Sequence, residues 1–127
     1  MPLTNAGRDF IAKAIINDSP TFFNNANAHL GAGDSDTAFA AAQTNLQAVT
    51  NKLRKGMEAT YPQRIGNVLT FRSLFGTAEA NWDWEEWGVF NHATAGEMLS
   101  RKAETLGTKA STQSWQLTVD IEVAIGA

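Results

Sequence analysis

The sequence predicts an α+β fold that is mainly β: an antiparallel β-sandwich or sheet with an N-terminal helix and a short second helix. Three features predict it. Apolar residues near the N-terminus recur at helical spacing, residues 37–48 are rich in alanine, and from Asn67 onward apolar and polar residues alternate. A chain of 127 residues with no repeat and no linker is the usual size of one domain, so we expect a single domain over 1–127.

The composition narrows the class of protein. The chain is 43% hydrophobic and 18% charged with a net charge of −3, which is typical of a globular protein and not of a disordered one. It has no cysteine, so disulfides and thiolate metal sites are excluded. It shows neither a signal-peptide pattern nor a membrane-length apolar run, so we expect synthesis in the cytoplasm and no membrane partner. The slight acidity argues against nucleic-acid binding.

The first helix is expected over 5–16, with Thr4 as its N-cap. Its apolar stripe consists of Ala6, Phe10, Ile11, Ala14 and Ile15. Gly7 weakens the first turn by about 1 kcal/mol relative to alanine. Pro20 cannot continue the helix.

The middle of the chain is harder to assign. We expect a loop from residue 21, a short strand over 28–32, and a second helix over 37–48 capped by Asp36. Residues 49–66 mix charges with glycine and proline, and are expected to form strand and loop of uncertain register.

The second half reads as hairpin-connected strands. Residues 67–75 place Leu69, Phe71 and Phe75 on one face, and residues 96–106 form another candidate strand. The clearest pattern is the alternation over 114–125, which predicts a long strand with one buried face. Its apolar members are Trp115, Leu117, Val119, Ile121, Val123 and Ile125.

The stretch "NWDWEEWGVF" (81–90) holds three of the four tryptophans. If its strand is unbroken, one face carries Trp82, Trp84, Glu86, Gly88 and Phe90, and the other carries Asp83, Glu85, Trp87 and Val89. Large apolar groups on both faces predict that one face fills the core. The other would be covered by a helix, a loop or a neighbouring subunit. A sugar-stacking platform built from the tryptophans is an alternative.

The acidic residues of this stretch give little support for an enzyme. Glu85 and Glu86 would point to opposite faces, so they could not flank one glycosidic bond, while Asp83 and Glu85 share a face. We expect these acids to be solvated or hydrogen-bonded. We also expect Glu86 to accept hydrogen bonds from nearby backbone or from an arginine such as Arg101.

Other candidate ligands do not form a recognisable site. "GAGDSD" (31–36) lacks the remaining residues of a phosphate or calcium loop, and His29 and His92 are the only histidines. We therefore predict no catalytic residue, no cofactor and no metal.

Several segments together resemble small structural proteins of tailed bacteriophages. They are "LTNAGRDFIAKAI", "NANAHLGAGDSDTAFAAAQTNLQA", "NKLRKGMEATYPQR", "GNVLTFRSLFGTAEANWDWEEWGVFN" and "GEMLSRKAETLGTK", which cover nearly the whole chain. The most specific part is an acid followed by Trp-Gly-Val-Phe, then a small-residue turn and Met-Leu-Ser-Arg. This part is also similar to the fibre-attachment domains of phage tail-collar proteins.

The resemblance implies a β-rich, non-enzymatic virion protein that binds other copies of itself, with a trimer as one arrangement, and other virion proteins. Fibre proteins continue from such a domain into a long shaft, whereas the given sequence ends at Ala127, directly after the last predicted strand. We therefore expect a head-decoration (cement) protein on the capsid. A small tail, baseplate or fibre-attachment subunit is the alternative within this class. A carbohydrate-binding module using the tryptophans and a small hydrolase using Asp83 or Glu85 are alternatives of other classes.

Candidate contact residues follow from residue type. Aromatic residues anchor protein interfaces, and a basic cluster could meet an acidic capsid or tail surface. The predicted contact residues are Trp82, Trp84, Trp87, Phe90, Phe22, Phe23, Lys52, Arg54, Lys55 and Arg64.

Overall fold

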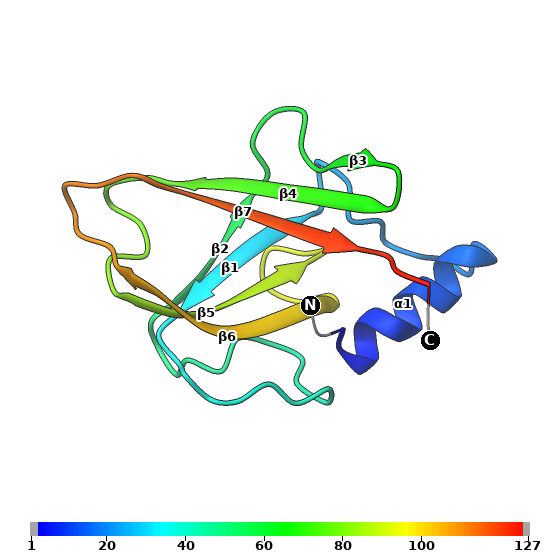
Figure 1. Ribbon diagram of the computed structural model, residues 1–127, viewed down its shortest axis with the longest axis horizontal. Helices are drawn as coiled ribbons and strands as arrows, with labels where there is room; N and C mark the ends of the chain where they lie inside the picture. Colours follow the sequence, from blue (N-terminus) through cyan, green and yellow to red (C-terminus); the bar gives the residue numbers. More distant parts are fainter. Residues whose placement is uncertain (1–2, 126–127) are drawn as a thin grey trace.

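The computed structural model describes residues 3–125 and is mainly β (Figure 1). Its elements are α1 (Asn5–Ile15), β1 (His29–Gly33), β2 (Lys52–Gly56), β3 (Gln63–Ile65), β4 (Val68–Phe75), β5 (Asp83–Phe90), β6 (Met98–Thr108) and β7 (Trp115–Glu122). The predicted α+β, mainly β class and the N-terminal helix are thus confirmed. Over the described range, no helix has the length and apolar character needed to cross a membrane.

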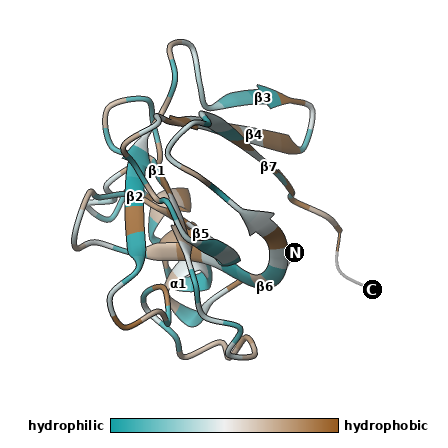
Figure 2. Ribbon diagram, turned by 90° about the vertical axis from the view of Figure 1, so that its left-hand side faces the viewer, coloured by the Kyte–Doolittle hydropathy of each residue, from teal (hydrophilic) through white to brown (hydrophobic). Residues whose placement is uncertain are grey.

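The strands form two antiparallel sheets. The four-stranded sheet has the order β2-β1-β5-β6, and the three-stranded sheet has the order β3-β4-β7. Side chains from the two sheets meet in one core, because Leu30 and Val89 of the first sheet belong to the same buried cluster as Phe71 and Val119 of the second. Figure 2 shows the two sheets from the side. Helix α1 packs on the first residues of β6.

Helix α1 begins as predicted, since the Thr4 hydroxyl accepts a hydrogen bond from the Gly7 backbone N–H at 2.9 Å. Gly7 has a packing role that the sequence did not reveal. A Cβ at this position would lie 2.3 Å from the Leu99 carbonyl oxygen, so glycine lets the helix approach β6 closely. The apolar stripe is only partly buried. Phe10 packs inward, but Ile11 is 38% exposed and Ile15 is 79% exposed.

The second helix predicted over 37–48 is wrong. This segment is irregular, with short turns. The backbone N–H groups of Gln47 and Ala48 donate to the Glu86 carboxylate at 2.7 and 2.8 Å. An α-helix would direct such groups to its own carbonyls, so the carboxylate outweighs the helix preference of the alanines. The segment instead covers one face of β5.

The predicted strands mostly have the expected positions. The expected strands over 28–32, 67–75 and 96–106 correspond to β1, β4 and β6. The mixed segment 49–66 contains β2 and β3. The long alternation stops earlier than predicted, because β7 ends at Glu122, and Ile125 is fully exposed instead of buried.

Candidate interaction surface

The tryptophan-rich strand β5 is a central, largely buried strand of the four-stranded sheet. Trp87 and Val89 pair with Ala32 and Leu30 of β1 and face the shared core. On the other face, Phe90 packs with Leu46 and Met98 beneath the 34–51 segment. Both faces are therefore covered within one chain, as the sequence predicted. The second face is covered by a loop, one of the three covers expected from the sequence.

The expected alternation fails at the start of this strand. β5 begins at Asp83, so Trp82 lies outside it, and its pairing with β6 shifts register between Trp84 and Glu86. Trp84 joins the core that holds Trp87, in edge-to-face contact with Phe75 and Trp115 at centroid distances of 4.9 and 5.1 Å. The assumption of an unbroken strand put Trp84 and Trp87 on opposite faces, and the irregular pairing explains the difference.

The tryptophans do not form an open platform. Trp84 is 2% exposed and Trp87 is 7% exposed, and each indole N–H donates within the chain, to the Ala80 carbonyl and to Glu104. Trp82 is partly buried against the same core. A sugar ring stacks on an accessible aromatic face, which Trp84 and Trp87 do not offer. Trp84, Trp87 and Phe90 are core residues here, so we place the contact surface elsewhere.

The acids of the stretch each have a partner on β6. Asp83 accepts from the Thr108 hydroxyl at 2.5 Å, and Glu85 accepts from the Thr105 hydroxyl at 2.6 Å. These bonds tie neighbouring strands together. Asp83 and Glu85 are therefore each engaged by a threonine hydroxyl of β6.

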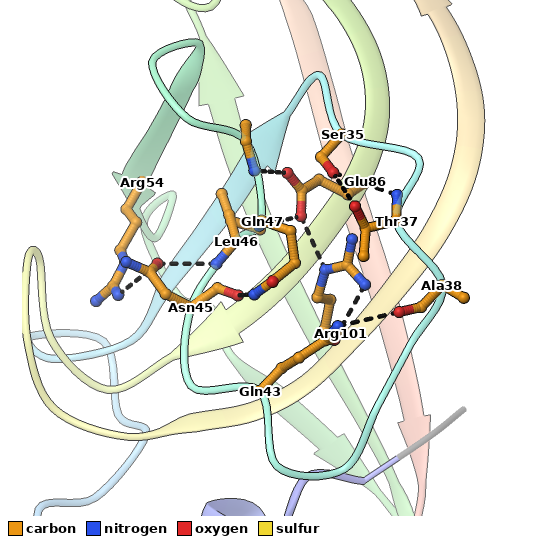
Figure 3. Close-up of polar contacts among 11 residues, drawn as sticks. Ser35, Thr37, Ala38, Gln43, Asn45, Leu46, Gln47, Arg54, Glu86 and Arg101 are labelled. Atoms are coloured by element: carbon orange, nitrogen blue, oxygen red, sulfur yellow. Dashed lines mark hydrogen bonds and ion pairs between the residues drawn. The ribbon is translucent and has the colours of Figure 1, made fainter.

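Glu86 lies at the centre of a buried polar network (Figure 3). Besides the two backbone N–H groups of the 34–51 segment, it accepts a bond from Arg101 Nε at 2.8 Å, and both side chains are fully buried. The expected partnership with Arg101 and nearby backbone is thus confirmed. Arg101 Nη1 also donates to Gln43 at 3.1 Å. A buried pair with this many bonds fixes the segment over β5 and is a structural device.

The predicted basic cluster is largely engaged within the chain. Arg54 donates to the carbonyls of His92 and Ala95, and its guanidinium stacks on Phe90 at 3.6 Å from the ring centroid. Burial lowers the pKa of Arg54 to about 10. Lys55 binds Glu79 at 2.7 Å.

The ion pair between Lys55 and Glu79 also affects the pKa of Glu79. The hydrogen bond from Lys55 and a second one from the Gly76 N–H hold the pKa of Glu79 below its usual 4.5. Only Lys52 and Arg64 remain exposed members of the basic cluster, with Arg64 donating to the Gly66 carbonyl. The cluster is therefore a weak candidate for a basic contact surface.

The two phenylalanines of the Asn-rich loop lie in different environments. Phe22 is half exposed, whereas Phe23 packs edge-to-face on Phe10 with 4.8 Å between ring centroids. Phe23 thereby lies at the edge of an apolar groove.

This apolar groove runs between α1 and β6 on one side and β4 and β7 on the other, and has a volume of about 390 Å³. It is lined by Leu3, Phe10, Ile11, Phe23, Pro62, Leu69, Phe71, Leu99, Ile121, Glu122, Val123 and Ala124. Glu122 is the only charged residue in this lining. An open apolar groove with half-exposed residues such as Ile11 and Val123 at its rim is typical of a protein contact surface.

Sequence reasoning did not identify the groove, because it depends on how the helix and the second sheet are spaced. The sequence carried one signal, the broad apolar stripe of α1. The fold buries this stripe only in part. The chain matches no protein-family model and no curated protein.

Proposed function

We propose that this chain is a non-enzymatic structural component of a tailed bacteriophage virion. Its role is that of a head-decoration protein that binds the assembled capsid and stabilises it through protein–protein contacts. The open apolar groove between α1 and the three-stranded sheet is the observation that carries the binding role. The resemblance of the chain to small phage structural proteins supplies the virion as the place where that binding occurs.

The chemistry of the tryptophan-rich stretch supports a binding role over an enzymatic one. Each acid on β5 is hydrogen-bonded to a threonine or to the Arg101 network, and two of the indoles there are enclosed in the core. This arrangement stabilises a rigid scaffold. The groove is an open apolar surface, and we assign it as the contact with the capsid protein.

Decoration stabilises a shell by mass action. A protein that binds only the assembled state adds about RT ln(1 + [L]/Kd) of free energy per site. Many copies on one capsid make modest affinity per site sufficient, and linked copies increase the effective affinity further. The proposed partners are therefore other copies of this chain and the major capsid protein.

Electron microscopy of virions that carry a label on this protein tests the location. Labels distributed over the head support decoration. Labels confined to the tail or baseplate would replace it with the alternative role of a small tail, baseplate or fibre-attachment subunit. Virions without any label, in a preparation where the protein is expressed, would contradict both roles.

A further inference from the structure

The strand β7 is an edge strand without the usual protection against pairing. The other three edges carry such protection: β2 holds Lys52, Arg54 and Lys55, β3 has only three residues, and β6 shifts register against β5. In contrast, β7 spans eight residues with no lysine, arginine or proline, and pairs with β4 without a register shift. A long regular edge of this kind is a template for another strand.

The backbone of β7 presents free hydrogen-bonding groups on its outer side. The Val123 N–H donates to the Asn67 carbonyl at 2.8 Å, so the odd-numbered residues direct their backbone groups toward β4. Orientation alternates along an antiparallel strand, so Gln116, Thr118 and Asp120 direct their N–H and C=O groups to the open edge. Within residues 3–125, these outward groups have no backbone hydrogen-bond partner.

The side chains of β7 leave this edge unobstructed. Asp120 accepts a hydrogen bond from Thr70 of β4 at 2.7 Å, and Thr118 accepts one from Arg72 of β4 at 3.2 Å. Both side chains lean toward β4, away from the open side.

The groove lies directly beside this open edge. The three-stranded sheet is one strand narrower than the four-stranded sheet: β4 lies against β1 and β2, and no strand of the second sheet covers the Leu99 end of β6 within the described residues. Leu99 of β6 and Ile121 of β7 both line the groove, and Figure 2 shows β7 and β6 bordering the open side. A strand added to β7 would cover the mouth of the groove.

We propose that the β7 edge and the apolar groove together bind one extended segment of a partner polypeptide, added as a fourth strand. Its inward side chains are apolar, because they enter the groove. Its outward side chains are basic, because Asp120 and Glu122 make the outer face of β7 acidic and Glu122 also borders the groove. In strand addition the backbone bonds supply affinity and alternate side chains supply specificity. This inference deepens the proposed function by giving the chemistry of the partner segment.

A synthetic peptide of about nine alternating valine and lysine residues, capped at both ends, is a suitable probe. Titrated into the full chain, it is expected to shift the NMR amide signals of Gln116, Thr118 and Asp120. Two control peptides separate strand addition from general attraction: one N-methylated at alternate amides, and one with the same composition in a valine block and a lysine block. Both are expected to bind at least about tenfold more weakly. Equal binding of either control would overturn the proposal.

Variants of the chain test the two halves of the site. Thr118→Pro removes an outward N–H and no backbone bond to β4, and proline is tolerated at edge positions of this kind. It also removes the exposed side-chain bond from Arg72, so Thr118→Val, which loses that bond but keeps the N–H, is its matched control and should bind like wild type. Ile11→Asp places a charge in the groove. Thr118→Pro and Ile11→Asp are each expected to weaken peptide binding at least about tenfold. The matched control Val49→Asp alters an exposed apolar residue outside the groove and should leave binding unchanged. Unchanged binding in either site variant contradicts the proposal. If Thr118→Pro fails to fold, the N-methylated peptide decides.

Self-association is a distinct outcome. A concentration-dependent dimer in analytical ultracentrifugation that Thr118→Pro abolishes would show that a second copy occupies the edge, and would overturn the partner assignment. The peptide assay needs no virion. Peptide binding in a protein absent from virions would therefore refute the proposed function alone, and virion labelling without peptide binding would refute this inference alone.

Discussion

At the scale of single residues, the buried Glu86 carboxylate links β5, β6 and the 34–51 segment. It accepts bonds from Arg101 and from the backbone of Gln47 and Ala48, all at 2.7–2.8 Å, in a fully buried position. An ion pair buried in this way adds little net stability compared with apolar packing, but breaking it leaves a charge without a partner. Its role is to hold an irregular segment in one position.

Glu86→Gln is therefore expected to destabilise the protein by about 3–5 kcal/mol, because the Arg101 charge stays buried without a counter-ion. Urea unfolding measures the loss. Glu85→Gln on the same strand is the matched control and should cost about 1 kcal/mol, since that carboxylate has one hydrogen bond to Thr105 near solvent. The double variant Glu86→Leu with Arg101→Met should stay destabilised, because the two backbone N–H groups lose their acceptor. Full recovery in the double variant would contradict the account.

Glu79 gives a prediction about pH. Its pKa is lowered in the folded state, chiefly by the hydrogen bond from Lys55. A carboxyl group with a lowered folded pKa stabilises the fold above its unfolded pKa, and this contribution is lost as the pH falls through the folded value. Wild type should therefore be more stable than Glu79→Gln at pH 7, and the difference should shrink below about pH 4.5. Thermal unfolding across this range checks it, with the exposed Asp9→Asn as control; a difference that persists at low pH would point to packing.

At the scale of elements, local patterns predicted the strands well and the middle of the chain poorly. Alternation is set by the strand itself, so β4 and the Leu117–Ile121 part of β7 follow from sequence. The 37–48 segment has the composition of a helix, yet a carboxylate 38 residues later takes its N–H groups. The early end of β7 and the groove depend on the spacing of the sheets. No local pattern encodes this spacing.

The docking of α1 on β6 yields an element-scale prediction. Gly7→Ala would raise helix propensity by about 1 kcal/mol, but its Cβ meets the Leu99 carbonyl, a backbone atom that cannot move alone. We expect a net loss of stability in thermal unfolding followed by circular dichroism. The exposed Ala12→Gly calibrates the propensity term at about 1 kcal/mol. A higher melting temperature for Gly7→Ala would show that the helix is not held as closely as described.

At the scale of the whole molecule, the large apolar residues are not buried and exposed where the sequence predicted. The aromatic residues that the sequence nominated as contacts mostly fill the core, while isoleucines and valines that it assigned to buried faces lie open around the groove. Ile11 and Val123 are examples. The tryptophan-rich strand thus supplies a rigid scaffold, and the groove with the β7 edge supplies the surface on which the proposed function depends.

The most direct test of this account is the number of copies that bind to purified capsid shells lacking the protein, for wild type, Ile11→Asp and Val49→Asp. Wild type and both variants should first be shown to be folded by circular dichroism. The account predicts that Ile11→Asp loses most of its binding, because the aspartate enters the apolar groove, and that Val49→Asp binds like wild type. Equal binding of wild type and Ile11→Asp would contradict the claim that the groove is the contact surface.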